Sequence, residues 1–416
     1  MNIVKLKKLC LEGRRITAEY DVSGTEEWIN YFTEPYIMYA EYDFSVEDIP
    51  YSVAVIPFVS NILSMLWIFD ATLYVDEIDK AYFESIPEFQ KGFIELHPDF
   101  TYGGKIECKK LVENHSAVPN EKVAAFFSGG VDATYTLVSH IEEKPVLVTI
   151  WGADMPVKNE EGWEIVYSHS KRIADMFELE LQTVKTNFSL ILNKRILNIF
   201  IRQTEPDSNW YEHFMYGLTF YGHMAPIAYS CGITGFYMAS SNTPDDIGNY
   251  TCSSDPIIDD YIRFVDAVGI HDAFETDRQS KVQGICEYSH KIGKGIPLRV
   301  CFYDLKGYNC CKCEKCYRTM LSIIAEGDNP VDYGFPLYND ALRAEMMKEI
   351  KKKHWIRCRF GGYNYNYIQD KIRKNYTYKE CPEDLKWFYK VKITNRYPLW
   401  VKIYCKLSAV AHKIIK

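Results

Sequence analysis

Positive charge is scarce through most of this sequence, which argues against a protein that binds nucleic acid over its whole surface. Its 416 residues include 48 Lys and Arg against 56 Asp and Glu, a formal charge of −8. The scarcity ends at Arg343, because the segment from there to the C-terminus has nineteen basic and six acidic residues. This basic C-terminal region predicts an anionic or protein partner, or else a solvated surface that faces the protein's own acidic groups.

We also expect neither a secretory leader nor a membrane-spanning apolar run. A secretory leader contains an apolar stretch, whereas residues 1–15 are rich in charged side chains. The longest uncharged run, Ile49–Phe69, is long enough to cross a membrane, but prolines and polar residues interrupt it: Pro50, Ser52, Pro57, Ser60, Asn61 and Ser64. We therefore expect this run to be buried core, and we expect a cytoplasmic protein with no transmembrane span.

Disulfide bonds are not expected, although the chain has thirteen cysteines, because disulfide frameworks belong to secreted proteins. Five of the cysteines are clustered between Cys301 and Cys316. We interpret the other eight as small core residues: Cys10, Cys108, Cys231, Cys252, Cys286, Cys358, Cys381 and Cys405.

A glycine turn at residues 128–133 is the most informative local motif. It is not a Walker A loop, since no Gly-Lys-Ser/Thr follows, and it is not Gly-x-Gly-x-x-Gly. Ser128-Gly129-Gly130-Val131-Asp132-Ala133 follows an apolar run, Val123–Phe127, that predicts a buried strand, and precedes a segment, Thr134–Ile141, that predicts a helix. Free backbone N–H groups and the helix dipole make such a junction an anion site. The alternative is an ordinary strand–turn–helix junction whose glycines allow tight packing.

Ser-Gly-Gly-x-Asp-Ser/Thr after a strand resembles the PP-loop of ATP pyrophosphatases, which split ATP between its α- and β-phosphates and adenylylate a substrate. This sequence departs from the pattern at Ala133, where the family usually has a hydroxyl. Thr134 offers a hydroxyl one residue later, from a different angle on the helix.

The clustered cysteines have the spacing of a metal site. Cys310-x-x-Cys313-x-x-Cys316, with Cys301 nine residues earlier, offers four thiolates within sixteen residues, enough for a closed tetrahedral zinc site. Cys311 is the extra residue and is an alternative to Cys310 as a ligand. An iron–sulfur cluster or paired reactive thiols are the competing interpretations.

The glycine turn followed about 170 residues later by this cysteine spacing resembles the 7-cyano-7-deazaguanine synthase family. In that family a carboxylated deazapurine is activated by ATP and converted with ammonia to a nitrile, and four cysteines hold zinc. The resemblance covers about Val123–Leu321. The Pro-Asp-Cys-Arg element of the family is missing, with Cys252-Ser253-Ser254-Asp255-Pro256 in its place, so a divergent paralogue with another substrate is expected.

Three regions are predicted along the chain. Residues 1–118 alternate short apolar strands with one helix, Lys80–Glu95, which predicts an α+β accessory domain. Residues 119–330 are predicted to be the ATP-binding domain with the cysteine cluster, and residues 331–416 a basic helical region. The strands predicted in the first region are 16–20, 36–40, 53–56 and 71–75.

From Val123 strands alternate with helices, which predicts an open parallel sheet with helices on both faces, like that of HUP and PP-loop proteins. The predicted strands are 123–127, 146–151, 179–184 and 235–239, and the predicted helices are 162–177 and 211–232. Polar residues follow several strands, and the carboxyl ends of parallel strands meet at one edge. One cleft is therefore expected to gather Ser128, Trp151–Gly152, Thr186–Asn187 and Ser240–Asn242.

The basic region is predicted to contain a helix over 341–355, then an aromatic-rich segment over 360–367. Pro398–Lys416 interleaves aromatic and apolar residues with lysines. Such a segment can bind RNA, lie on a membrane or a partner, or pack its apolar face on the rest of the protein.

The resemblance implies ATP-dependent adenylylation of a carboxylate, followed by attack of ammonia or an amine. ATP and Mg²⁺ would bind at Phe127, Ser128, Gly129, Gly130, Val131, Asp132, Thr134, Trp151 and Gly152. Asp132, Asn242 and Asp246 are the candidate catalytic residues, with Asp255 and Arg318 as further candidates for substrate contact. Cys301, Cys310, Cys313 and Cys316 would hold Zn²⁺, and the protein is a candidate homo-oligomer.

Two alternatives remain. One is a nucleotide-binding regulatory or assembly protein, which Ala133 favours. The other is a tRNA-sulfurtransferase-like enzyme, which needs a reactive cysteine, with Cys231 and Cys252 as the candidates.

Overall fold

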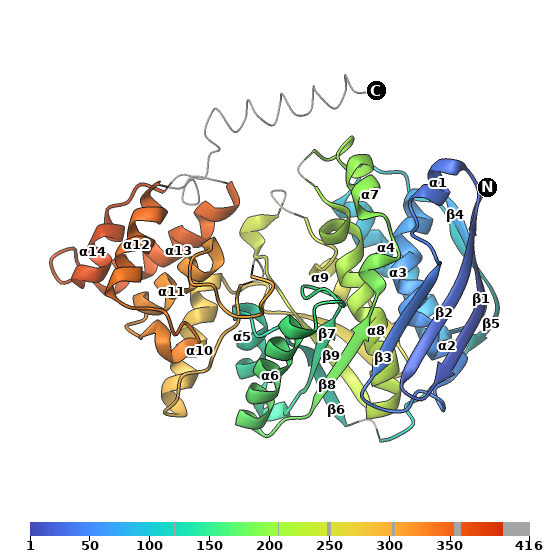
Figure 1. The fold of residues 1–416 in the computed structure, drawn as a ribbon, viewed down its shortest axis with the longest axis horizontal. Coiled ribbons are helices and arrows are strands. Elements are labelled where there is room, and N and C mark those ends of the chain that lie inside the picture. Colours follow the sequence, from blue (N-terminus) through green and yellow to red (C-terminus); the bar gives the residue numbers. More distant parts are fainter. Residues whose placement is uncertain (120, 207, 248–250, 302–303, 353–358, 394–416) are drawn as a thin grey trace. The chain divides into compact units, whose positions relative to one another are not determined.

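The computed structural model describes residues 1–119, 121–206, 208–247, 251–301, 304–352 and 359–393 (Figure 1). The chain forms two compact units. Unit 1 consists of Met1–Phe127 and His140–Phe274, and unit 2 consists of Ser128–Ser139 and Glu275–Lys416. The domain boundaries predicted at residues 118 and 330 stay predictions.

Unit 1 is built on a single open sheet to which all eleven strands of the described residues belong. The strands are β1 (Asn2–Glu12), β2 (Arg15–Ser23), β3 (Ile37–Tyr42), β4 (Ala71–Asp79), β5 (Lys105–Val112), β6 (Lys122–Phe126), β7 (Val146–Trp151), β8 (Leu181–Thr186), β9 (Ile233–Ala239), β10 (Arg263–Phe264) and β11 (Ala267–Asp272). Their order across the sheet is β10-β11-β9-β6-β7-β8-β3-β2-β1-β4-β5 (Figure 1).

Five neighbouring strands, β11-β9-β6-β7-β8, are parallel to one another. Following the chain, β6 comes first, β7 and β8 extend the sheet to one side, and β9 and β11 extend it to the other. The strand order therefore reverses between β6 and β9, and ligands of open α/β sheets bind outside the carboxyl ends of the strands at such a point. The predicted fold class, an open and mostly parallel α/β sheet, is confirmed.

The strands of residues 1–112 continue this sheet. β3 pairs antiparallel with β8, so that Ala40 faces Thr186, and β2, β1, β4 and β5 follow outward. Three of the four strands predicted in this region are present, as β2, β3 and β4.

The fourth predicted strand, 53–56, is wrong. Residues there form α2 (Tyr51–Ala54) and the start of α3 (Ile56–Ile68). Pro50 caps α2 and Pro57 lies in the first turn of α3, positions where a helix has no N–H bond for proline to break. The run Ile49–Phe69 is otherwise buried as predicted, and no described helix is both long and apolar enough to cross a membrane.

Helices cover both faces of the sheet in unit 1. Besides α2 and α3 they are α1 (Glu26–Asn30), α4 (Lys80–Leu96), α6 (Glu160–Phe177), α7 (Lys194–Ile201), α8 (Tyr216–Cys231) and α9 (Pro256–Asp259). A π-helical turn, Tyr211–Met215, leads into α8. Phe220 and Tyr221 of α8 pack against Phe126 of β6. α6 lies on the other side of β7, where its Trp163 stacks on Trp151.

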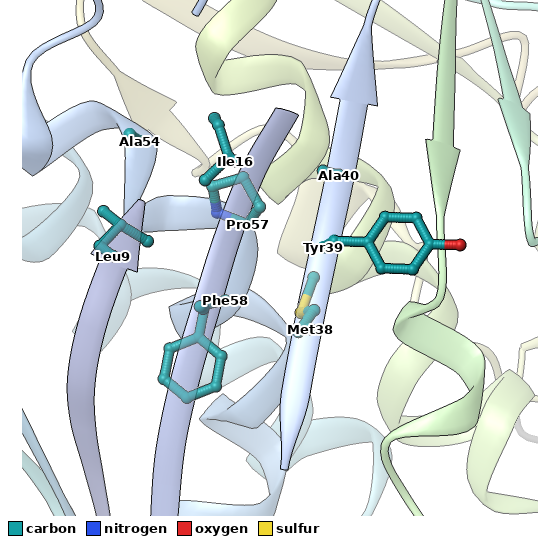
Figure 2. A pocket seen from close by; sticks show the side chains of 9 residues that line it. Leu9, Ile16, Met38, Tyr39, Ala40, Ala54, Pro57 and Phe58 are labelled. Atoms are coloured by element: carbon teal, nitrogen blue, oxygen red, sulfur yellow. The ribbon is translucent and has the colours of Figure 1, made fainter. Parts of the chain in front are cut away.

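A small apolar pocket lies where α2 and α3 meet β1, β2 and β3 (Figure 2). Tyr39 is the one lining residue with a polar group on its side chain, and the others are apolar, among them Leu9, Met38, Pro57 and Phe58 (Figure 2). We assign this pocket to core packing.

Unit 2 is helical among the described residues. Its helices are α5 (Val131–Ser139), α10 (Arg278–Lys291), α11 (Glu314–Ala325), α12 (Asp340–Lys352), α13 (Arg359–Asn375) and α14 (Glu383–Tyr389). α10 packs on α5, α11 and α13. The helix predicted over 341–355 is present as α12 as far as Lys352. The basic and aromatic segment Pro398–Lys416 lies outside the described residues, so its predicted partner stays a prediction.

Candidate functional site

The glycine turn leaves β6 along a strand end that is fixed by hydrogen bonds. Phe127 is buried, its N–H donates to the Val148 carbonyl at 2.8 Å, and its carbonyl accepts from the Thr149 hydroxyl at 2.8 Å. Gly129 follows with φ +78°, a backbone conformation that residues with a Cβ rarely adopt. The Thr134 N–H donates to the Gly130 carbonyl at 2.9 Å and closes the first turn of α5.

α5 begins earlier than the predicted Thr134, at Val131, which places Asp132 in its first turn. The first N–H groups of a helix have no partner within the helix and carry its positive dipole end. The hydroxyl of Thr134 is fully buried and has no hydrogen-bond partner among the described residues. Ala133 is buried and supplies no hydroxyl.

Asp132 does not face open solvent, because two cations of α10 hold its carboxylate. Arg278 Nη1 donates to Asp132 Oδ2 at 2.8 Å, and Lys281 Nζ lies 3.6 Å from Oδ1. The side chains of Asp132, Arg278 and Lys281 are 17%, 16% and 2% exposed. Burial by itself raises the pKa of Asp132, but the charges of Arg278, Lys281 and Lys315 outweigh it, so the pKa is lowered and the carboxylate is ionised.

Two further cations of unit 2 act on this group of side chains. Lys315 acts electrostatically on Asp132, and Arg318 acts on Arg278 while pairing with Glu314 at 3.4 Å. Cations gathered beside a helix N-terminus favour binding of a polyanion.

The glycine turn is also tied to the segment that carries the first clustered cysteine. The backbone N–H of Arg299 donates to the Gly129 carbonyl at 2.7 Å, and its Nε donates to the Ser128 carbonyl at 3.1 Å. The side chain of Asn309 braces this segment, accepting from the N–H groups of Val300 and Cys301 at 2.9 and 3.3 Å. The cysteine cluster thus lies two residues from a direct contact to the turn.

Four of the five clustered cysteines converge. The sulfurs of Cys301, Cys310, Cys313 and Cys316 all lie within 4.8 Å of one another, with Cys310–Cys316 at 3.9 Å and Cys301–Cys313 at 3.8 Å. A regular tetrahedron with Zn–S bonds of about 2.3 Å has S–S edges of about 3.8 Å. The cluster could therefore bind a metal such as zinc.

Cys311 is not part of this cluster. It is buried with φ +55°, and its thiol lies 3.5 Å from the Asn309 carbonyl. Of the two cysteines left open at this position, the structure therefore selects Cys310.

Comparison with family models, curated proteins and solved structures found no match. The resemblance described above therefore depends on the glycine turn and the cysteine spacing alone.

The predicted site residues are divided between the units. Ser128–Asp132, Thr134 and the four cysteines belong to unit 2, whereas Phe127, Trp151, Gly152, Asn242 and Asp246 belong to unit 1. Their predicted roles in binding and catalysis stay predictions.

Trp151 and Gly152 are held tightly at the end of β7. The Trp151 indole stacks on Trp163 at 5.1 Å, lies under Lys185 Nζ at 4.1 Å, and donates to the Pro156 carbonyl. Gly152 has φ +118°, and a Cβ there would lie 2.0 Å from the Thr186 carbonyl oxygen. Gly152 is therefore required for the close approach to β8.

The acidic residues after β9 make local capping bonds. Asp246 accepts from the N–H and hydroxyl of Thr243 at 2.9 and 3.2 Å, which forms a capping box. Asp255 caps α9 by accepting from the Ile257 N–H, and burial raises its pKa. The N–H and carbonyl of Asn242 both bond the Ser240 hydroxyl.

Four basic residues of the site were not predicted from the sequence: Arg278, Lys281, Arg299 and Lys315. Arg278 and Lys281 are three residues apart behind the N-cap Asp277, so they share one face of α10. Arg299 precedes Cys301 by two residues. No sequence pattern links any of them to Asp132 or Gly129, which are more than 140 residues away.

A second buried polar network in unit 1 was also missed. Asp259 Oδ2 accepts from His271 Nδ1 at 2.6 Å and from the Ser254 hydroxyl at 2.7 Å. His271 Nε2 is buried with no hydrogen-bond partner among the described residues. This network lies at the carboxyl end of β11.

Proposed function

We propose that the chain binds ATP through the glycine turn and the start of α5 and transfers its adenylyl group to a carboxylate, releasing pyrophosphate. The observation that carries the proposal is the pair of buried cations, Arg278 and Lys281, beside the first turn of α5. Both lie against Asp132 with little exposure, and a triphosphate offers several anionic oxygens that such cations bind.

The residues present fit this chemistry. The carboxylate oxygen attacks the α-phosphorus, the bond from that phosphorus to the bridging oxygen breaks, and pyrophosphate leaves with the electron pair. The N–H groups of the first turn of α5 and the cations of α10 would stabilise the charge on the leaving pyrophosphate. Asp132 would hold Mg²⁺, which would supply positive charge to offset that of the phosphates. Ammonia or an amine then displaces AMP from the activated carbon.

The cysteine cluster would hold Zn²⁺ through four thiolates. Four protein ligands leave no open coordination position, so this zinc is proposed to be structural. It would fix the segment 298–301 and with it the contact of Arg299 to the glycine turn.

Burial argues against the sulfur-transfer alternative. It raises the pKa of Cys231 to about 11 and that of Cys252 to about 12, so neither thiol is ionised at neutral pH. In the regulatory alternative the protein binds nucleotide at the same site without turning it over. The experiment described next distinguishes this alternative from an enzyme.

The test is carboxylate-dependent exchange of radioactive pyrophosphate into ATP by the full chain, with Mg²⁺ and a panel of carboxylic acids. Exchange is expected for the wild type and is expected to fall about a hundredfold or more in Asp132→Asn. Glu287→Gln, an exposed carboxylate on α10, is the matched control and keeps the wild-type rate. Nucleotide binding without AMP or pyrophosphate release would favour the regulatory protein.

A further inference from the structure

Asp132 is the residue that the proposed function needs for a metal ion, yet its carboxylate is already occupied. Arg278 bonds one oxygen at 2.8 Å and Lys281 lies 3.6 Å from the other. A divalent cation cannot approach this carboxylate closely while both cations remain there, because like charges repel strongly in a partly buried site.

The two cations are themselves confined. Lys281 is 2% exposed, and Arg278 follows Asp277, which caps α10. Their charged ends therefore stay near the first turn of α5 in any state in which α5 and α10 remain packed. If Asp132 turned away, Arg278 would need another anion, because an unpaired buried charge is costly.

We propose that Asp132 is an internal substitute for phosphate: it neutralises Arg278 and Lys281 in the empty site, and a bound polyphosphate takes these two cations while Asp132 turns to the metal ion. The identity of the ligand as ATP rests on the proposed function. The exchange of partners itself requires only a polyphosphate.

This exchange makes the binding of metal and polyphosphate interdependent. Without metal, the negative charge of Asp132 competes with phosphate for the two cations and opposes binding. With metal, the same carboxylate contributes to binding. Removing the charge of Asp132 should therefore have opposite effects on polyphosphate affinity in the absence and presence of metal.

The experiment is calorimetric titration of the full chain with inorganic tripolyphosphate, in EDTA and in excess Mg²⁺. In EDTA, Asp132→Asn is expected to bind about tenfold more tightly than the wild type. In Mg²⁺, Asp132→Asn is expected to lose most of the gain that Mg²⁺ gives the wild type. Unchanged or weaker binding of Asp132→Asn in EDTA would overturn the proposal.

Variants of Arg278 test the other half of the exchange. Arg278→Gln is expected to weaken tripolyphosphate binding about tenfold or more in both conditions, while Arg278→Lys, which keeps the charge, loses less. Glu287→Gln is again the control for a charge change on α10. An Arg278→Gln variant that binds tripolyphosphate like the wild type would overturn the proposal.

A separate readout does not depend on Asp132→Asn folding. With no phosphate present, Arg278→Gln frees one side of the Asp132 carboxylate, so it is expected to bind Mn²⁺ several-fold more tightly than the wild type, measured by water proton relaxation. Equal Mn²⁺ affinity would show that Arg278 does not block the metal, and the inference would fall.

The two proposals fail separately. If the tripolyphosphate and Mn²⁺ results hold but no carboxylate gives pyrophosphate exchange, the adenylylation proposal falls and the partner exchange stands. If exchange occurs in the wild type but Asp132→Asn binds tripolyphosphate in EDTA no better, only the partner exchange falls.

Discussion

At the scale of single residues, Gly152 shows how a candidate ligand contact can also be a packing requirement. Its positive φ and the Thr186 carbonyl oxygen 2.0 Å from the place of a Cβ exclude any side chain. Gly152 fixes the loop after β7 against β8.

Gly152→Ala is therefore expected to destabilise unit 1 by about 2 kcal/mol, through backbone strain together with steric overlap. Urea unfolding followed by tryptophan fluorescence measures the loss. Gly13→Ala is the control, since Gly13 also has positive φ, +58°, but open space around it. It should cost only about 1 kcal/mol. Equal losses in the two variants would contradict the overlap at Thr186.

The cysteines show which site residues local spacing can predict. Cys310, Cys313 and Cys316 belong to one short turn, so their convergence follows from chain geometry, and Cys301 joins from nearby. The contact of Asp132 with Arg278 joins residues 146 positions apart and depends on how α10 packs on α5. No motif in the sequence encodes that packing.

Metal content gives a direct test of the cluster. The purified wild type is expected to carry about one zinc per chain, and Cys313→Ser is expected to lose it because a three-sulfur shell is incomplete. Cys311→Ser should keep its zinc, since Cys311 lies outside the cluster. Elemental mass spectrometry decides the matter, and a wild type free of both zinc and iron would contradict a metal site.

At the scale of elements, apolar runs were the least predictable part of the fold. The alternation of β2, β3 and β4 and the uninterrupted apolar run of β7 were sufficient to predict strands. Val53–Ile56 is equally apolar but forms helix. The sequence could not predict this, because residues that are buried on all sides show neither a period of two nor one of 3.6. In the sequence Pro50 and Pro57 argue against a continuous helix, but in the structure each lies at the start of a helix.

Helix α8 contains a buried histidine that is expected to make unit 1 sensitive to acid. His223 is fully buried, bonded to the Thr219 carbonyl at 2.6 Å and to the Thr186 hydroxyl at 3.1 Å. Burial lowers its pKa from 6.5 to about 4. A proton therefore binds the unfolded chain more readily than the folded one, so the contribution of His223 to stability is complete above pH 6.5 and falls as the pH is lowered towards 4.

Lowering the pH from 7.5 to 5 is expected to remove about 2 kcal/mol of unfolding free energy through His223 alone. Comparison of urea unfolding for the wild type and His223→Gln isolates this amount. The variant, although less stable at neutral pH, should lose about 2 kcal/mol less over this interval. A variant with the same pH dependence as the wild type would show that His223 is not the group that titrates.

At the scale of the whole molecule, the N-terminal region shares its core with the parallel sheet. One cluster of buried side chains extends from Val4 to Ala267. Polar bonds cross the same boundary: the Thr219 hydroxyl donates to Asn61, whose amide nitrogen donates to the Phe188 carbonyl. Residues before and after the predicted boundary at 118 therefore contribute to the same core.

Removal of residues 1–118 is therefore expected to give an insoluble protein. The truncation exposes the edge of β8 and the face of α8 that packs on α3, and such surfaces aggregate. Expression of residues 119–416 followed by gel filtration tests this expectation. A soluble fragment with a cooperative thermal transition would instead support the boundary predicted at 118.

The division of unit 2 between Ser128–Ser139 and residues after 274 has a consequence for the time course of synthesis. α5 has nine residues, too few to be a stable helix alone, and its partner α10 starts 139 residues after α5 ends. At roughly 5–20 residues per second, α5 waits on the order of ten seconds for that partner to leave the ribosome. The strands before and after α5 can pair meanwhile, so the glycine turn is expected to be among the last parts of the nascent protein to mature.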